Sequence, residues 1–299
     1  MNVKKVTYTP DDIEKNKDCA LVLQGGSLRC LFTCGVLDYL MHKGVWFPYV
    51  NGVSAGSLCA ISYISGQIGR TAKVNIDYVN DKRYLGLRNL LKGRSIFNFD
   101  FLFGEIADQL IPLDKEAFFS SPIKYTAVAV DCATGASAYF TKEDCSDIML
   151  GARASSSLPL LARKVTVDSK VCLDGGVCEP VAYKKAFEDG YKKQVIVLTR
   201  EYGYRKTPSS KPMLTAYHRA YREYPELITA LEAMPDKYNS IISEIEQLEK
   251  DGKIFVIRPD KPVTINRLEK NTKKLKELYK DGIHAAKNSY EALTEYLKQ

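Results

Sequence analysis

The chain has 299 residues, of which 45% are hydrophobic and 26% are charged. This balance indicates a folded globular protein and excludes a disordered one. The formal net charge is +7, and most of the basic excess lies in residues 250–299. Neither the first residues, MNVKKVTYTPDDIEKNKD, nor any later segment has the uncharged apolar run that a signal peptide or a membrane helix needs. We therefore expect a cytoplasmic protein with a substantial core.

The first part of the chain alternates between short apolar runs and segments of helical period. Residues 20–23 and 49–53 each predict a buried strand, and residues 30–43 and 57–65 predict the helices that follow them. The order of strand, helix, strand and helix predicts an α/β fold with a mostly parallel sheet covered by helices. Further strands are expected at 124–131, 138–140, 170–173 and 194–198, and a further helix at 182–189.

Residues 84–103 are apolar and aromatic, but glycine and arginine interrupt them, so that they fit neither the helical nor the strand period. Two interpretations stay open for this segment. It lines the mouth of a substrate site, or it is a loop that covers the core.

The composition changes after the TPSSKP segment at residues 207–212. Long helical stretches are expected at 214–224, 225–248 and 266–299. The apolar run KIFVIR at 253–258 predicts one strand that returns to the main sheet. The expected organisation is a lead-in at 1–19, an α/β domain at 20–206 and a helical C-terminal extension at 207–299.

The sequence shows no spacing typical of a metal site. The eight cysteines lie inside apolar segments, and the three histidines are scattered along the chain. Cysteines in such positions are predicted to be small, buried and reduced side chains. We expect no metal ion and no cofactor.

Residues 52–56 read GVSAG, which matches G-x-S-x-G, and they lie between a predicted strand and a predicted helix. A sharp turn at this junction needs the small residues Gly52 and Gly56, and it exposes the hydroxyl of Ser54 at a helix N-terminus. Ser54 is therefore the candidate nucleophile. A purely structural glycine turn is the alternative interpretation of this motif alone.

The loop after the first strand reads QGGSLR and contains Gly25, Gly26 and Ser27. Glycines allow neighbouring backbone N–H groups to point together at an anion. An oxyanion hole for acyl transfer needs such fixed donors, so that these three residues are its candidates. A dinucleotide-binding loop is the alternative, but the G-x-G-x-x-G spacing is missing.

Asp174 follows the apolar run VCL and precedes Gly175 and Gly176. This arrangement predicts a carboxylate at the end of a strand. Since Asp-Gly is also common in hairpin turns, a simple turn stays open when the motif is considered alone.

Four motifs occur together in this chain: GGSLR, GVSAG, RASSSLP at 153–159, and DGG. Their order and spacing resemble those of the patatin-like phospholipases over about residues 20–180. The C-terminal part resembles a bacterial subgroup that has a helical extension. The resemblance implies a three-layer fold in which helices flank a mostly parallel sheet.

The same resemblance implies a Ser54–Asp174 dyad, an oxyanion loop at Gly25 to Ser27, and Arg29 as the basic residue behind that loop. The implied activity is the release of a fatty acid from a glycerolipid or another carboxylic ester. Ser27 and Cys30 stand where the family usually has glycine. If either position needs a positive φ, its side chain costs about 1 kcal/mol.

Two alternative functions and the role of one basic surface stay open. A Ser-Asp-His triad would use His218 or His284, although both lie in ordinary helical contexts. A lipid-binding or scaffolding protein without turnover is the alternative outside the enzymes. The basic stretch at 268–280 is either a solvated surface or a peripheral contact with the anionic inner face of a membrane. Nucleic acid is not an expected partner.

Overall fold

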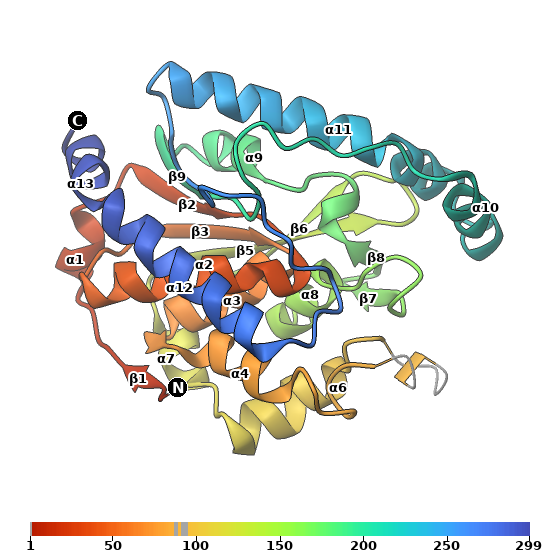
Figure 1. Cartoon of the computed structure of the whole chain (residues 1–299), viewed down its shortest axis with the longest axis horizontal. Helices are drawn as coiled ribbons and strands as arrows, with labels where there is room; N and C mark the ends of the chain where they lie inside the picture. Colours follow the sequence, from red (N-terminus) through yellow and green to blue (C-terminus); the bar gives the residue numbers. More distant parts are fainter. Residues whose placement is uncertain (1, 87–88, 91–94) are drawn as a thin grey trace.

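A computed structural model describes residues 2–86, 89–90 and 95–299, and Figure 1 shows that helices cover both faces of a central sheet. The main sheet has eight strands in the order β10-β9-β2-β3-β5-β8-β7, and β6 also pairs with β5. The strands are β2 (Cys19–Leu23), β3 (Tyr49–Val53), β5 (Lys124–Asp131), β6 (Ser137–Thr141), β7 (Val165–Val167), β8 (Lys170–Asp174), β9 (Lys193–Val197) and β10 (Phe255–Ile257). A separate small sheet pairs β1 (Lys4–Lys5) with β4 (Gln67–Ile68).

The sheet is parallel from β10 to β5 and antiparallel where β6, β7 and β8 join it. Every residue of β2 and β3 is buried, because helices cover these strands on both faces. This explains why their sequences are continuous runs with little alternation of polar and apolar residues. The mixed α/β fold with a mostly parallel sheet is therefore confirmed.

Strand β5 brings the ends of β3 and β8 together. Val53, the last residue of β3, pairs with Val128, and Asp174, the last residue of β8, pairs with the next residue, Ala129. Strand β6 pairs along one edge of β5, over the residues that also pair with β3 and β8. Strands β3 and β8 must therefore both lie along the other edge of β5, where their C-terminal ends meet. The residue after β3 thus lies beside Asp174, although 120 positions separate them in the sequence.

Helices form a layer on each face of the sheet (Figure 1). The larger core lies between the sheet and α2, α3 and α12, and a second core lies between the sheet and α9 and α11. The α-helices of the described chain are α1 (Pro10–Glu14), α2 (Cys30–His42), α3 (Ala55–Ile64), α4 (Arg70–Tyr78), α6 (Phe99–Phe101), α7 (Lys115–Ser120), α8 (Ile148–Ser155), α9 (Tyr183–Glu188), α10 (Lys211–Ala220), α11 (Pro225–Lys250), α12 (Thr272–Asn288) and α13 (Tyr290–Lys298). Helical turns of other types are η1 (Ser27–Arg29), η2 (Leu102–Leu110) and η3 (Gly175–Val177).

The C-terminal extension is built into the main domain. Strand β10 pairs in parallel with β9, which confirms the predicted return of the chain to the sheet. Helix α12 crosses α2 at two glycines, where a Cβ on Gly35 would lie 2.1 Å from the Tyr279 carbonyl oxygen and one on Gly282 2.0 Å from that of Phe32. Only glycine at both positions allows the two backbones to approach so closely.

Several predicted boundaries need correction. The helix expected at 57–65 begins at Ala55, directly after Ser54. The stretch at 266–299 is two helices, because the side chain of Asn271 caps the start of α12 and Ser289 separates α12 from α13. The helix expected at 214–224 is α10, which begins and ends earlier. Part of the 84–103 segment, residues 87–88 and 91–94, lies outside the described residues.

No helix in the described ranges is both long enough and apolar enough to cross a bilayer.

Candidate active site

Ser54 stands at a sharp turn between β3 and α3. Its backbone has φ 56° and ψ −129°, a conformation that a non-glycine residue rarely adopts and that often marks a functional site. A Cβ on Gly52 would lie 2.5 Å from the Ser57 nitrogen, and one on Gly56 would lie 2.5 Å from the Leu23 carbonyl oxygen. The two glycines of the GVSAG motif are therefore needed for close approach of the backbones, as the sequence predicts.

The hydroxyl of Ser54 donates a hydrogen bond of 2.6 Å to Oδ2 of Asp174. The other carboxylate oxygen, Oδ1, accepts a bond of 2.8 Å from the N–H of Gly176. Both side chains are buried, with 6% of Ser54 and 3% of Asp174 exposed. The candidate nucleophile and its candidate base are in direct contact here, and the carboxylate is held in place by the turn Gly175–Val177 that follows β8.

Burial raises the pKa of the Asp174 carboxyl above its ordinary value. The hydrogen bonds from Ser54 and Gly176, and the charges of Arg267 and Lys206, act in the opposite direction. A carboxylate with a raised pKa is a stronger base than an exposed aspartate, while the nearby cations favour its ionised form.

Two serines of the segment 153–159 position the pair, a role that the sequence alone did not reveal. The Ser155 hydroxyl accepts a bond of 2.8 Å from the Ser54 N–H and donates one of 2.6 Å to the Val128 carbonyl. The carbonyl of Ser157 accepts the Asp174 N–H at 2.8 Å. The RASSSLP motif was noted in the sequence as part of a resemblance, and the structure gives it a physical role.

The glycine loop lies directly against Ser54. A Cβ on Gly25 would lie 2.9 Å from the Ser54 Cβ, and one on Gly26 would lie 2.8 Å from the Thr199 hydroxyl oxygen. Within the described ranges, the N–H groups of Gly25 and Gly26 donate to no acceptor of the protein. These donors are thus available to an oxygen atom of a ligand bound beside Ser54.

Ser27 has φ 48°, in the left-handed region, whereas Cys30 has an ordinary helical φ of −59°. Of the two positions where glycine is expected, only Ser27 therefore carries backbone strain. Its side chain lines the site together with Ser54. The carbonyl of Gly25 lies 3.1 Å from the Thr199 hydroxyl at the end of β9, which ties the strained loop to the sheet.

Two cavities meet at Ser54. The first, which we call the apolar cavity, is lined mainly by hydrophobic side chains of α3, α4 and the segment around α6 and η2. Its aromatic and aliphatic lining includes Leu58, Ile61, Tyr84, Phe97, Phe99 and Leu102. Of the two interpretations of residues 84–103, the described part of the segment supports the lining of a site.

The second, which we call the polar cavity, contains Asp174 and the glycine loop. It also contains four basic side chains, from Arg29, Arg200, Lys206 and Arg267. The sequence predicted only Arg29 here. The other three follow β9 or precede α12, and no motif or spacing links them to the site.

None of the three histidines, all in the described part of the chain, lines either cavity. His218 is on α10, and its Nε2 is 2.8 Å from a carboxylate oxygen of Glu232 on α11. His284 is exposed on α12. The structure therefore does not bring a histidine to Ser54 and Asp174.

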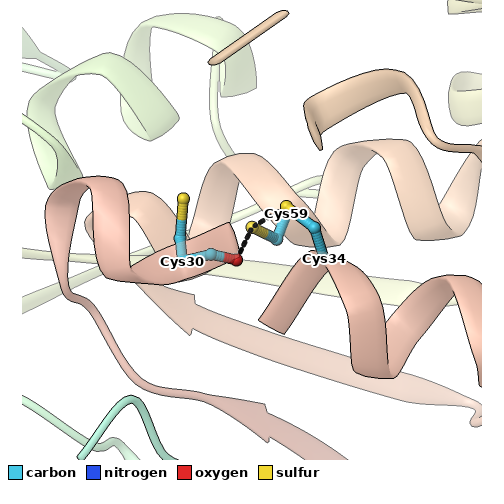
Figure 2. A group of neighbouring side chains, drawn as sticks. All are labelled: Cys30, Cys34 and Cys59. Carbon is cyan, nitrogen blue, oxygen red and sulfur yellow. Dashed lines mark hydrogen bonds between the residues drawn. The ribbon is translucent and has the colours of Figure 1, made fainter. Parts of the chain in front are cut away.

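Figure 2 shows a group of three buried cysteines, Cys30, Cys34 and Cys59, whose sulfur atoms lie within 4.8 Å of one another. The sulfurs of Cys34 and Cys59 are 3.7 Å apart, and Cys30 lines the apolar cavity. Thiolates are ligands for soft metal ions, but burial raises the pKa of the Cys34 thiol and so disfavours the thiolate form. The group packs α2 against α3. Its signal in the sequence is the four-residue spacing of Cys30 and Cys34, which places them on one helix face.

The lysines of α12 lie on the surface, while Leu275 and Leu278 of the same helix are buried in the core. The apolar face of this helix is therefore already covered by the protein.

Residues 21–187 match the patatin-like phospholipase family, and residues 224–298 match a domain of unknown function (DUF6363). The chain is 29% identical over 269 residues to the uncharacterized protein YjjU of Escherichia coli K12, covering 88% of this chain and 74% of that protein. It is 25% identical over 162 residues to the uncharacterized NTE family protein Mb1092c of Mycobacterium bovis, covering 54% of this chain and 43% of that protein. The crystal structure of VipD from Legionella pneumophila is similar to this structure with a TM-score of 0.49 and 12% sequence identity. The alignment covers 98% of this chain and 70% of the VipD chain.

Proposed function

Because this chain belongs to the patatin-like phospholipase family, we propose that it is a serine lipid acyl hydrolase with Ser54 as nucleophile and Asp174 as general base. One observation carries the proposal. The 2.6 Å hydrogen bond from the Ser54 hydroxyl to Asp174 lies at the junction of an apolar and a polar cavity. An ester bond placed at this junction has a nucleophile, a base and backbone donors within reach.

The reaction proceeds in two halves. As the Ser54 oxygen attacks the ester carbonyl carbon, its proton moves to Oδ2 of Asp174. The tetrahedral intermediate collapses, the leaving alcohol takes that proton, and an acyl group stays on Ser54. Water then attacks the acyl-enzyme, gives a proton to Asp174, and releases the fatty acid as the proton returns to Ser54. No histidine is needed, because the carboxylate contacts the hydroxyl directly.

The negative charge of the intermediate develops on the former carbonyl oxygen. Gly25 lies directly against Ser54, and the N–H groups of Gly25 and Gly26, for which the described residues offer no hydrogen-bond acceptor, are the proposed donors to this oxygen. Donors that are fixed in advance stabilise such a charge without reorganisation, and removing one typically costs about 10²- to 10³-fold in rate. The apolar cavity is the proposed place for the acyl chain, since its lining is mainly hydrophobic.

A lipid-binding protein without turnover is the second candidate. The observation that favours it is the φ of 48° at Ser27, because strain at this position can turn the oxyanion donors away from their target. Such a protein would still bind an acyl chain in the apolar cavity but would leave Ser54 unreactive.

Covalent labelling with a fluorophosphonate separates the two candidates. We expect the natural chain to be labelled at Ser54 and to hydrolyse a short-chain p-nitrophenyl ester. Ser54→Ala should abolish both signals, and Asp174→Asn should lower the hydrolysis rate on the order of 10⁴-fold. His218→Gln and His284→Gln are the controls, since neither side chain lines a cavity at Ser54. Absence of labelling in a folded natural chain that still binds lipid would support the binding protein.

A further inference from the structure

The polar cavity carries more positive charge than the reaction at Ser54 requires. We call its four basic side chains the basic cluster: Arg29, Arg200, Lys206 and Arg267. Among the described residues that line this cavity, Asp174 is the one carboxylate, and it already accepts hydrogen bonds from Ser54 and Gly176. The cluster therefore has an excess of three charges over the acid beside it.

Within the described part of the chain, no member of the basic cluster forms a salt bridge. The Nε atoms of Arg29 and Arg200 are buried and have no hydrogen-bond partner there. Buried donors without a partner are costly, and like charges gathered in one cavity add repulsion. An anion that binds among these side chains would offset the repulsion between their charges.

The pKa values of the cluster agree with this geometry. Burial, together with the charges of Arg200 and Arg267, lowers the pKa of Arg29 to about 10. Burial and the neighbouring arginines lower the pKa of Lys206 to about 8. Both groups lack a negative partner strong enough to restore their ordinary values. A dianion bound in the cavity would supply one.

We propose that the basic cluster binds a phosphate monoester, which makes an anionic glycerolipid with a terminal phosphate the preferred substrate of this site. The assignment rests on the proposed hydrolase function. Ser27, Ser54 and Leu158 line both cavities, so that the nucleophile lies between them. A glycerolipid whose acyl chain occupies the apolar cavity and whose phosphate occupies the polar cavity presents its ester to Ser54.

The cluster discriminates against a zwitterionic headgroup. A quaternary ammonium group needs a carboxylate or an open aromatic face. The ring of Tyr204 is covered by the Arg200 guanidinium at 4.4 Å, and that of Tyr238 by the Lys206 ammonium at 4.4 Å. Two of the tyrosine rings that line the polar cavity are thus each in contact with one of the protein's own cations, and these cations repel an incoming ammonium.

Three members of the cluster lie outside the segment that matches the patatin-like family. Arg200 and Lys206 follow β9, and Arg267 precedes α12, whereas the match ends at residue 187. Headgroup selection by this chain would therefore depend mainly on residues that follow the matched segment, while Ser54, Asp174 and Arg29 lie within it.

The test compares monomeric dihexanoyl phosphatidic acid with dihexanoyl phosphatidylcholine, which share acyl chains and differ at the headgroup. We expect the natural chain to prefer phosphatidic acid at least about 10-fold in kcat/KM, the usual size of a charge-assisted hydrogen bond. Lys206→Gln and Arg267→Gln should each lower this ratio about 10-fold. Lys270→Gln, which removes the same charge three residues from Arg267 at a position that lines neither cavity, should leave the ratio unchanged. Equal rates on both lipids, or a ratio that the cluster variants do not alter, would overturn the proposal.

Binding to Ser54→Ala, measured by calorimetry, separates this proposal from the proposed hydrolase function. We expect dihexanoyl phosphatidic acid to bind at least about 10-fold more tightly than inorganic phosphate, and Arg267→Gln in the same background to weaken it about 10-fold. Equal affinity for the two ligands would identify free phosphate as the ligand and overturn the headgroup assignment. If Ser54→Ala binds the lipid as expected but the natural chain hydrolyses no ester, the hydrolase proposal fails and the binding subsite stands.

Discussion

Two serines that line both cavities of the candidate site have positive φ, with 48° at Ser27 and 56° at Ser54. The strain at Ser54 accompanies a specific contact, because the same turn brings its hydroxyl to Asp174. No comparable contact explains the backbone strain at Ser27, since glycine would adopt this conformation without cost. The two residues therefore differ in what a substitution by glycine should do.

We expect Ser27→Gly to increase the rate of fluorophosphonate labelling by up to about 5-fold, which corresponds to about 1 kcal/mol of relieved strain. The loop donors would then reach the oxyanion with less distortion, so that kcat rises and KM changes little. Ser27→Ala is the matched control, because it removes the hydroxyl and keeps the Cβ that causes the strain. A glycine variant no faster than the alanine variant would show that Ser27 fits its position comfortably.

The sequence predicts the parts of the site that depend on local backbone geometry. Ser54 and its two glycines form a contiguous motif, because the turn itself needs those residue types. Asp174 could be placed at a strand end, but its contact with Ser54 depends on how β3 and β8 share the edge of β5. The basic residues after β9 could not be found at all, since loops of unrelated sequence bring them to the cavity.

At the scale of elements, apolar runs and helical periods predict the central strands well, because complete burial leaves a clear hydrophobic signal. Strand β7 was missed, because it is three residues long and exposes its central threonine. The break between α12 and α13 was also missed, because it depends on a single serine within a continuous helical pattern. Short elements and small interruptions carry too few residues to show a period.

Helix α2 is joined to two other helices through one buried carboxylate. Asp38 accepts hydrogen bonds from the Gly69 N–H at the start of α4, at 2.9 Å, and from the Tyr279 hydroxyl of α12, at 2.8 Å. Burial is the main reason that the pKa of Asp38 is raised to about 6. Neither hydrogen bond compensates fully for the loss of water around the charged form.

This raised pKa makes a pH-dependent contribution to stability. The folded chain holds the Asp38 proton more tightly than the unfolded chain, whose pKa is about 3.9. The free energy of unfolding therefore decreases as pH rises from about 4 to about 6, by on the order of 3 kcal/mol from this group. Asp38→Asn stays neutral and can still accept the Gly69 N–H. We expect its melting temperature to exceed that of the natural chain at pH 7 and to approach it near pH 4.

Asp236→Asn, on the exposed face of α11, is the control for this comparison because it removes a carboxylate in contact with water. It should follow the natural chain across the same range of pH. If Asp38→Asn is less stable than the natural chain at pH 7, the hydrogen bonds of the carboxylate outweigh its desolvation, and the stated cause is wrong.

At the scale of the whole molecule, the sequence divides the chain at residue 206, but the structure places both sides of that boundary in one core. Leu275, Leu278 and Leu293 of the extension are buried in the larger core together with α2. The hydroxyl of Tyr296 also accepts the Gln194 N–H of β9 at 3.1 Å. The helical extension therefore completes the face of the sheet that carries α2 and α3.

We expect a chain truncated after residue 206 to lose cooperative folding. Burying each large apolar side chain contributes about 1.5–3 kcal/mol, and the four side chains of the extension named above together approach the total stability of a typical domain, about 5–15 kcal/mol. Truncation also exposes the edge of β9 that β10 covers, which favours aggregation. Circular dichroism melts and size-exclusion chromatography of residues 1–206 should show no sharp transition and little monomer. Coexpression with residues 207–299 is the matched control, because it restores the same contacts without the covalent link and should recover folded protein. A soluble 1–206 fragment that melts cooperatively near the temperature of the full chain would establish two independent domains and contradict the single core.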